Sequence, residues 1–333
     1  MDSLTQIGLG AGIAGLAAPR QHRRKALLLG AALGTAPDLD VFLDFGGPVE
    51  NFTEHRGFSH SLLVLTPLAI GLWLALRRFW APVREAPGRW LAAILLALLT
   101  HPLLDAHTAY GTQLFWPLPV PPAKWGTLFI IDPLFTLPLL IGVITAVFWP
   151  AGLRAERVLR VGLVASVLYL GWSWVGKGLV TRQVDAYAAS AGLTGQPHFV
   201  TPTPFNTLLW RVVLMTDEGY LEGFDSLLLR GDLTFIAYPS AREALAENQD
   251  LDTVRRLDWF SGGLLRAEVL QDRLVLSDLR MGQEPSYVFN FAVAERGNPH
   301  WRPIAVEQIP ISLGDRALAG VWTRIWREPV PTP

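Results

Sequence analysis

The sequence predicts a mainly α-helical, polytopic membrane bundle of about five to six membrane helices, followed by a smaller β-rich soluble domain. Half of the 333 residues are hydrophobic and only 17% are charged, against about 25% in soluble domains. The charged residues are unevenly distributed, with 23 in residues 1–176 and 34 in residues 177–333. We therefore expect a transmembrane domain over residues 1–178 and an extracytoplasmic β-rich domain over residues 179–333.

The composition also excludes several classes of protein. The apolar content is too high for a disordered chain, and glycine lacks the three-residue period of collagen. The net charge of −1 provides no basic surface for nucleic acid, so no nucleic-acid partner is expected. The chain has no Cys, which rules out disulfides, zinc knuckles and thiol catalysis.

Six stretches of the first half contain no Asp, Glu, Lys or Arg: residues 3–19, 26–37, 57–76, 90–104, 133–153 and 161–176. A helix needs roughly 20 mainly apolar residues to cross a bilayer, so 57–76 and 133–153 are long enough on their own. The first two stretches are shorter and rich in Gly, and Gly8 and Gly12 have the spacing that lets membrane helices pack closely. The alternative is a large soluble helical core, which basic residues in alternate loops disfavour.

The loops between these stretches predict the orientation of the bundle. Connections 19–25, 77–89 and 154–160 hold eleven Lys and Arg residues, whereas 37–59 and 106–127 hold two. Because basic loops stay in the cytoplasm, this bias places the N-terminus and everything after about residue 177 on the outer side.

The second half has the pattern of short strands. Residues 206–215 and 221–229 are apolar runs around a Thr-Asp-Glu-Gly turn signal, which predicts a hairpin. Further strands are expected at 264–270, 273–279 and 287–294, with a tight turn at Gln271-Asp272, and the stretch 243–257 has a helical pattern. This half contains no Gly-rich phosphate loop, nucleophile elbow or His-Glu-x-x-His motif.

The polar residues near the ends of the apolar stretches in residues 1–176 fall into four groups. Ionisable residues in or beside membrane helices are costly and commonly functional. The groups are residues 37–40, 55–61, 101–105 and 132–133. The predicted orientation brings all four to the outer ends of their helices, so we expect them to meet on one side of the membrane.

The residue types in these groups favour a metal centre. His101 and Asp105 are four residues apart and share a helix face. Imidazole together with carboxylate is a ligand set for zinc, manganese or iron. The candidate metal ligands are Asp38, Asp40, His55, His60, His101 and Asp105. Six exceed the four ligands of one tetrahedral site, which suggests two metal ions, or one ion with a general base and supporting partners. A divalent metal, zinc or manganese, is therefore expected.

Three neighbouring residues have further expected roles. Arg56 could hold an anionic group such as phosphate through paired hydrogen bonds. Asp132 could act as the general base, or it could cap the helix that begins at Pro133. Ser59 is expected to cap the third apolar helix.

These motifs resemble the membrane-bound metal-dependent hydrolase family, the YdjM-like proteins. The resemblance covers about residues 1–150 and depends on Met1-Asp2-x-x-Thr5, Pro37-Asp38-x-Asp40, His55-Arg56-Gly57-x-Ser59-His60-Ser61, His101-Pro102-x-x-Asp105 and Thr108-x-Tyr110-Gly111-Thr112. It implies metal-assisted hydrolysis in the bacterial inner membrane. Family members commonly have His where this chain has Gln6, so Gln6 would be a weaker ligand or a hydrogen-bond partner. The resemblance assigns no role to the region after residue 180.

The leading expectation is a hydrolase at the outer leaflet that uses a metal-activated water on an ester or phosphoester of a lipid or lipid-linked substrate. A metal or small-molecule transporter is one alternative, although the sequence shows no inverted repeat and its polar groups cluster at one face. A non-catalytic membrane protein with a structural metal site is the other, and a fully coordinated metal would favour it.

Overall fold

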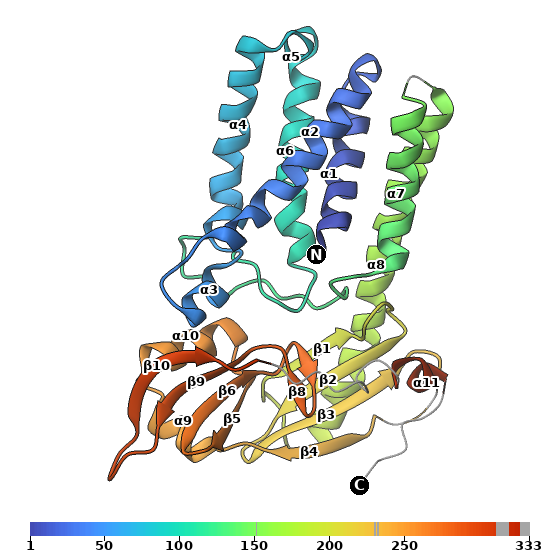
Figure 1. Ribbon diagram of the computed structural model, residues 1–333. Helices are drawn as coiled ribbons and strands as arrows, with labels where there is room; N and C mark the ends of the chain where they lie inside the picture. The colour runs from blue at the N-terminus through green and yellow to red at the C-terminus, as the bar shows by residue number, and fades with distance from the viewer. Residues whose placement is uncertain (151, 230, 232, 311–319, 327–333) are drawn as a thin grey trace. The chain divides into compact units, whose positions relative to one another are not determined.

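The computed structural model describes residues 1–150, 152–229, 231, 233–310 and 320–326 (Figure 1). The chain forms two compact units. The helical unit comprises Met1–Leu43 and His55–Ser173, and the β-rich unit comprises Asp44–Glu54 and Trp174–Pro333. The predicted division places one boundary at residue 178, whereas the contacts assign the short segment Asp44–Glu54 to the second unit as well.

In the described residues, the helical unit is built from five main helices and the first part of a sixth, α8 (Leu153–Ser190), which continues into the β-rich unit at Trp174, with short helical turns between them. The main helices are α1 (Ser3–Ala17), α2 (Arg23–Thr35), α4 (Leu62–Phe79), α6 (Pro87–Asp105), α7 (Pro133–Phe148) and α8, and the short elements are η1 (Arg20–His22), η2 (Ala36–Phe42), η3 (Phe58–His60) and α5 (Ala81–Glu85). Among the described residues, α4, α6 and α8 are long and apolar enough to cross a membrane, and α1 and α7 are shorter apolar helices. The predicted helical membrane half is thus confirmed with three candidate spans, and five to six spans remain a prediction.

Side-chain caps decide where several helices begin. Asp2 accepts a hydrogen bond from the Thr5 amide at 3.0 Å and starts α1, and Asp132 accepts one from Leu134 at 3.0 Å and starts α7. Each bond satisfies an amide that has no partner within the helix. The third apolar helix begins at Leu62 instead of residue 57, because its cap is Ser61, whose Oγ accepts from the Leu63 amide. The expectation that Ser59 caps this helix is wrong.

Helices α1 and α2 approach closely through glycine. A Cβ atom on Gly30 would lie 2.2 Å from the carbonyl oxygen of Gly10, and one on Gly34 would lie 2.5 Å from the carbonyl oxygen of Gln6. No side chain fits into such gaps, so the two backbones pack directly against each other. The predicted pair Gly8 and Gly12 faces side chains of α7 and α8 instead, since a Cβ on Gly8 would lie 3.3 Å from Leu140 and one on Gly12 would lie 3.7 Å from Leu159.

We expect Gly30→Ala to lower the thermal unfolding midpoint of the detergent-solubilised protein. Its new methyl group collides with backbone, which cannot rotate away, and overpacking of this kind costs about 1–3 kcal/mol. Gly71→Ala on α4 is the matched control, because a Cβ there meets no atom within 4 Å. Circular dichroism measures the unfolding midpoint of each variant. Equal midpoints for the two variants would contradict the close packing of α1 against α2.

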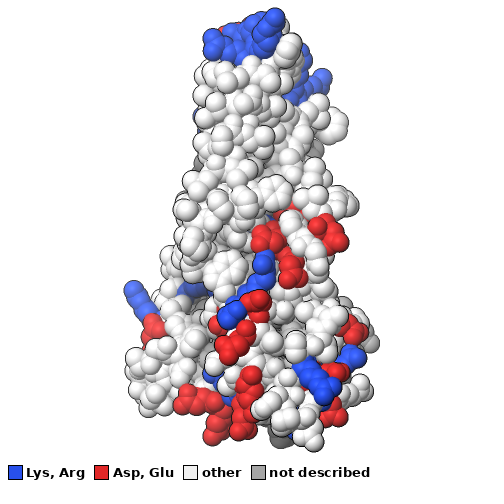
Figure 2. Space-filling view, turned by 90° about the vertical axis from the view of Figure 1, so that its left-hand side faces the viewer, with Lys and Arg blue, Asp and Glu red and all other residues white. Residues whose placement is uncertain are grey.

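Charged side chains are confined to the ends of the helical unit. Figure 2 shows Lys and Arg gathered at one end, next to a long surface without charged residues. The basic side chains there also satisfy helix ends: Arg89 donates to the carbonyl oxygens of Ala17 at 2.8 Å and Ala18 at 2.7 Å. An uncharged belt beside a basic rim is the surface that a bilayer favours.

The β-rich unit contains two four-stranded antiparallel sheets. The first has the order β1 (His198–Pro202), β2 (Leu209–Met215), β3 (Gly219–Ser226), β4 (Phe235–Pro239), and the second β10 (Arg302–Gln308), β9 (Asn290–Glu295), β6 (Arg273–Asp278), β5 (Leu265–Leu270). The other elements described in this unit are the C-terminal part of α8, a two-stranded ribbon of β7 (Gly282–Gln283) and β8 (Ser286–Tyr287), and the helices α3 (Pro48–Glu54), α9 (Arg242–Glu247), α10 (Asp252–Ser261) and α11 (Val321–Trp326).

The β-rich character of the second half is therefore confirmed. The turn at Gln271 and Asp272 forms as expected, since both residues have positive φ, the conformation of a tight hairpin turn. The predicted helix at 243–257 is two helices, α9 and α10, because the chain turns between Asn248 and Leu251. The pattern did not predict β1, β4 or β10, which have little apolar alternation, nor the short helix α3.

Candidate metal centre

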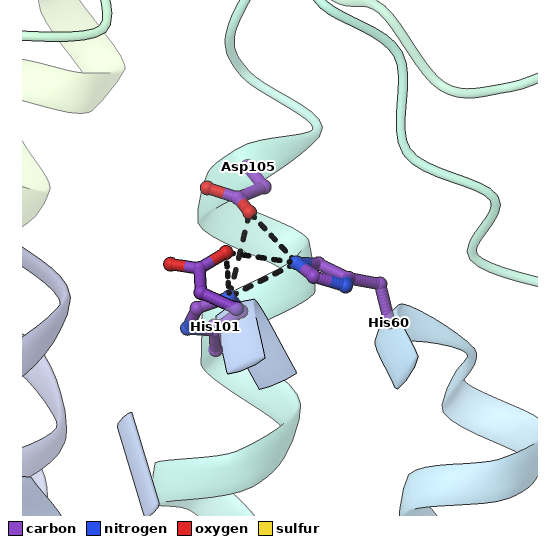
Figure 3. A group of neighbouring side chains, drawn as sticks. His60, His101 and Asp105 are labelled. Atoms are coloured by element: carbon purple, nitrogen blue, oxygen red, sulfur yellow. Dashed lines mark hydrogen bonds and ion pairs between the residues drawn. The ribbon is translucent and has the colours of Figure 1, made fainter. Parts of the chain in front are cut away.

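Four side chains from three parts of the helical unit converge at one point. Asp38 lies on η2, which follows α2, and His60 ends η3, which precedes α4. His101 and Asp105 lie one turn apart in the last part of α6 and face His60 (Figure 3). One ligand atom from each residue lies within 4.8 Å of all the others. The predicted helix ends therefore do meet, and they bring together Asp38, His60, His101 and Asp105.

The distances within this four-residue cluster fit a shared cation. His60 Nε2 lies 3.1 Å from both Asp105 Oδ2 and His101 Nε2, and 3.3 Å from Asp38 Oδ1. His101 Nε2 lies 3.4 Å from Asp38 Oδ1 and from Asp105 Oδ2. Donors about 2.0–2.2 Å from one metal ion, at angles of about 90–110°, stand about 2.8–3.6 Å apart. All five separations lie in this range.

Hydrogen bonds on the far side of each imidazole set its tautomer. His101 Nδ1 lies 2.6 Å from the carbonyl oxygen of Gly34, which can only accept, so Nδ1 carries the proton. His60 Nδ1 lies 2.9 Å from Ser59 Oγ, whose own proton goes to Asp40 at 2.5 Å. In the neutral form of each ring, Nε2 is then a lone pair, which points at the other ring and at two carboxylate oxygens. Two such lone pairs and two carboxylate oxygens repel one another unless positive charge lies between them, as a bound metal ion or as protons on the imidazoles.

The second oxygen of Asp105 is held by the start of α1. Gln6 Nε2 donates to Asp105 Oδ1 at 2.9 Å, and the amino nitrogen of Met1 also donates to this oxygen. Gln6 Nε2 also approaches the carbonyl oxygen of His101 at 3.2 Å. The structure thus makes Gln6 a hydrogen-bond partner that orients Asp105, and leaves Asp105 Oδ2 facing the two imidazoles.

Asp40 and His55, both expected as ligands, lie outside the four-residue cluster. Asp40 accepts three hydrogen bonds, from His55 Nδ1 at 2.8 Å, the Arg56 amide at 2.9 Å and the Ser59 hydroxyl. Burial is the largest influence on the pKa of Asp40 and acts to raise it, but the hydrogen bonds from His55 and Ser59 and the neighbouring imidazoles together outweigh burial, so the pKa lies below the usual value. The carboxylate connects His55 to Ser59 and, through Ser59, to His60.

Arg56 occupies a strained position beside the cluster. Its φ of +65° lies in the left-handed region, which is costly for any residue with a side chain. This conformation lets its amide donate to Asp40 while its carbonyl oxygen accepts from the Gln113 amide at 3.0 Å. The buried guanidinium lies 3.3 Å from Asp105 Oδ2 and stacks 5.0 Å from the centre of the Tyr110 ring. Arg56 therefore adds positive charge at the cluster and pairs with Asp105, and its role in holding an anion stays a prediction.

Both carboxylate oxygens of Asp132 form hydrogen bonds that support the fold. Its Oδ1 caps α7, and its Oδ2 accepts from the hydroxyl of Tyr169 on α8 at 3.0 Å. Burial raises its pKa above the usual value for Asp. Asp132 is not part of the four-residue cluster, so its catalytic role remains a prediction, while its alternative role as a helix cap is observed.

Sequence reasoning did not identify three supporting contacts around the cluster. The carbonyl oxygen of Gly34 is a backbone group and leaves no residue-type signal. The hydroxyl of Ser59 lies within the 55–61 motif, and its contact with both Asp40 and His60 depends on the turn of η3. Thr108, which accepts from Arg56 at 3.2 Å, lies in the motif after Asp105 and had no assigned role.

Comparison with known proteins relates this chain to inner membrane proteins. Residues 1–180 match the family model described as YdjM inner membrane protein. A protein of Bacillus subtilis (strain 168) named uncharacterized protein YfhP is 28% identical over 139 residues, 40% of this chain and 41% of that protein. The inner membrane protein YdjM of Escherichia coli (strain K12) is 33% identical over 89 residues, 24% of this chain and 43% of that protein.

The chain spans about two fifths of the length of the curated relatives it matches. The same match, at 33% identity over 89 residues, is found with inner membrane protein YdjM of Shigella flexneri. No solved structure matches this chain.

Proposed function

The chain belongs to the family of YdjM inner membrane proteins, and from that premise we propose that it is a metal-dependent hydrolase of the bacterial inner membrane. Its substrate is an ester or phosphoester of a lipid or lipid-linked molecule. The observation that carries the proposal is the convergence of two imidazole nitrogens and two carboxylate oxygens at 3.1–3.4 Å, buried beside an arginine.

Asp38, His60, His101 and Asp105 hold the metal in this proposal. Nitrogen and carboxylate donors together suit zinc or manganese better than magnesium or calcium, which prefer oxygen alone. When bound, such an ion polarises a carbonyl or phosphoryl oxygen and lowers the pKa of a coordinated water to about 7. Asp38 is the cluster residue nearest to solvent, at 19% exposure of its side chain, so substrate reaches the centre from its side.

His55 is the proton carrier in this proposal, and Asp40 orients it. The bond from His55 Nδ1 to Asp40 leaves Nε2 to accept or donate the proton of the reaction. The side chain of His55 is 22% exposed, and its ring lies 6.1 Å from the ring of His60. A partly exposed imidazole with a buried carboxylate behind it, next to a metal centre, has the arrangement that general acid–base catalysis needs.

Exposed apolar side chains on η2 favour a lipid substrate. Leu39 and Val41, which alternate with Asp38 and Asp40, are 55% and 63% exposed, and Phe42 is 82% exposed. Isolated apolar residues on a surface are ordinary, but a run of them on the segment that carries a metal ligand suits contact with acyl chains. With the basic loops in the cytoplasm, this segment belongs to the outer leaflet in our proposal.

A structural metal centre is the second candidate. Four protein donors are enough to close a tetrahedral zinc site, and closed sites are structural. X-ray absorption of the metal-loaded protein separates the two functions. A shell that contains only the four protein ligands favours a structural role, and additional light-atom ligands favour catalysis.

We expect the purified protein in detergent, supplied with zinc or manganese, to release phosphate or a free acid from a panel of phospholipids and lipid-linked phosphates. A chelator should abolish this release, and re-addition of the metal should restore it. The control is His22→Ala, because His22 bonds Glu85 at 2.8 Å and has no ligand atom in the cluster. Metal binding without hydrolysis of any panel member would contradict the hydrolase and leave the structural centre.

A further inference from the structure

The chain leaves the helical unit between two parts of the metal cluster. Asp38 lies before the segment Asp44–Glu54, and His55 to His60 follow directly after it. The segment itself belongs to the β-rich unit, where it forms α3. Two metal-ligand motifs are therefore joined by a helix whose tertiary contacts lie in the other unit.

Aromatic packing anchors α3 in the β-rich unit. The Phe52 ring lies 4.9 Å from Phe260 of α10, 4.4 Å from Phe289 and 5.4 Å from Phe291 of β9, measured between ring centres. Phe52 and Val49 are buried. Aromatic rings at these separations attract one another in addition to the apolar surface that they bury.

Arg256 of α10 adds a polar contact at the end of α3. Its Nε donates to Thr53 Oγ1, and its terminal nitrogen forms an ion pair with Glu54 Oε1. Glu54 is the last residue of α3 and is bonded covalently to His55. The contact thus holds the chain immediately before the pair that His55 forms with Asp40.

The connections on both sides of α3 are short. Residues 43–47 join Phe42 of η2 to Pro48, and residues 55–57 join Glu54 to η3. Because a residue spans at most about 3.6 Å, such connections transmit a displacement of α3 to the motifs on either side. Asp40 joins the two ends of this segment, since it lies before α3 and bonds the His55 ring and the Arg56 amide after α3.

We propose that the β-rich unit positions the metal centre through α3, with Phe52 and Arg256 as the positioning residues. Holding α3 shortens the free loop between Asp38 and His60, so less conformational entropy is lost when one metal ion binds both residues. The inference rests on the proposed metal site, and it assigns a role to the region after residue 180. By linkage, metal binding must in turn stabilise the attachment of α3 to the β-rich unit.

The test uses full-length protein in detergent with Co²⁺ alone as the probe, because Co²⁺ reports its ligands in its visible absorption spectrum. We expect Phe52→Ala to weaken Co²⁺ binding at least about tenfold, the effect of losing groups that orient metal ligands, and to alter the spectrum. Phe52→Leu should restore most of the affinity. The matched control is Phe235→Ala on β4, which removes a ring that packs 4.5 Å from Tyr187 in the same unit.

Hydrogen exchange of the metal-free protein supplies a second measurement. In Phe52→Ala the amides of Leu43, Arg56 and His60, which are hydrogen-bonded around the centre, should exchange faster, whereas Phe235→Ala should leave them unchanged. Unchanged Co²⁺ affinity and exchange in Phe52→Ala, or equal effects of both variants, would overturn the positioning role. If the wild type binds no Co²⁺, the metal site fails, and the exchange experiment still decides whether α3 positions these residues.

Discussion

Replacing His101 with Ala is expected to abolish metal binding, with metal content falling from about one ion per chain to near zero. The variant removes one of the four metal ligands and leaves two carboxylates and one imidazole. Its metal affinity should therefore fall by more than the about 10–100-fold that follows from removing a residue that only supports a ligand. Elemental analysis of protein purified in detergent and dialysed against a metal buffer measures the effect. The same variant should lose all hydrolysis that the chelator removes.

The control for this result is a histidine of the same unit outside the cluster. His22→Ala should retain the wild-type metal content, since His22 bonds Glu85 at the basic end of the helices. Because His101 is buried, the folded fraction of each variant must be checked by gel filtration. Full metal content in a folded His101→Ala variant would contradict the cluster as the metal centre.

Replacing His55 with Ala is expected to keep the metal and to lower hydrolysis about 10²–10⁴-fold, the usual contribution of a general acid or base. His55 contributes no atom to the four-residue cluster, and its Nδ1 is directed by Asp40 at 2.8 Å. The measurement is kcat on the best substrate of the panel, together with metal content. Had His55 been a ligand, as its position in the motif suggested, metal content would fall with activity.

Asp132→Ala distinguishes this assignment from the earlier expectation that Asp132 is the base. Loss of the cap of α7 should reduce stability by about 0.5–2 kcal/mol while metal content and kcat persist. The opposite outcome, with activity lost in Asp132→Ala and retained in His55→Ala, would return the role of base to Asp132.

The sequence by itself predicted the class of the molecule and the helix ends whose polar side chains lie together. Charge-free stretches and the shift in charge near residue 177 predicted a helical membrane half and a β-rich half. The spacing of His101 and Asp105 placed both on one face of α6, because the helix repeats every 3.6 residues. These features are local or compositional, and a pattern along the chain reports them directly.

Only the tertiary structure decided which of the six candidate ligands face a common point. Asp38 and Asp40 are two residues apart, yet only Asp38 joins the cluster, because the turn of η2 directs Asp40 toward the Arg56 amide and Ser59. His60 joins the cluster and His55 does not, because the Nδ1 of His55 is bonded to Asp40 instead. Such choices depend on backbone turns and on long-range hydrogen bonds, such as the one from His101 to Gly34.

The attachment of α3 to the β-rich unit was also decided by tertiary structure alone. Phe52 lies in a segment with no apolar period, and its aromatic partners are more than 200 residues away in the sequence. Burial of a ring among distant rings stabilises the fold through their combined surface, and no single segment encodes it. The sequence predicted that the polar groups at the helix ends meet, and packing between distant segments decided which of their side chains converge.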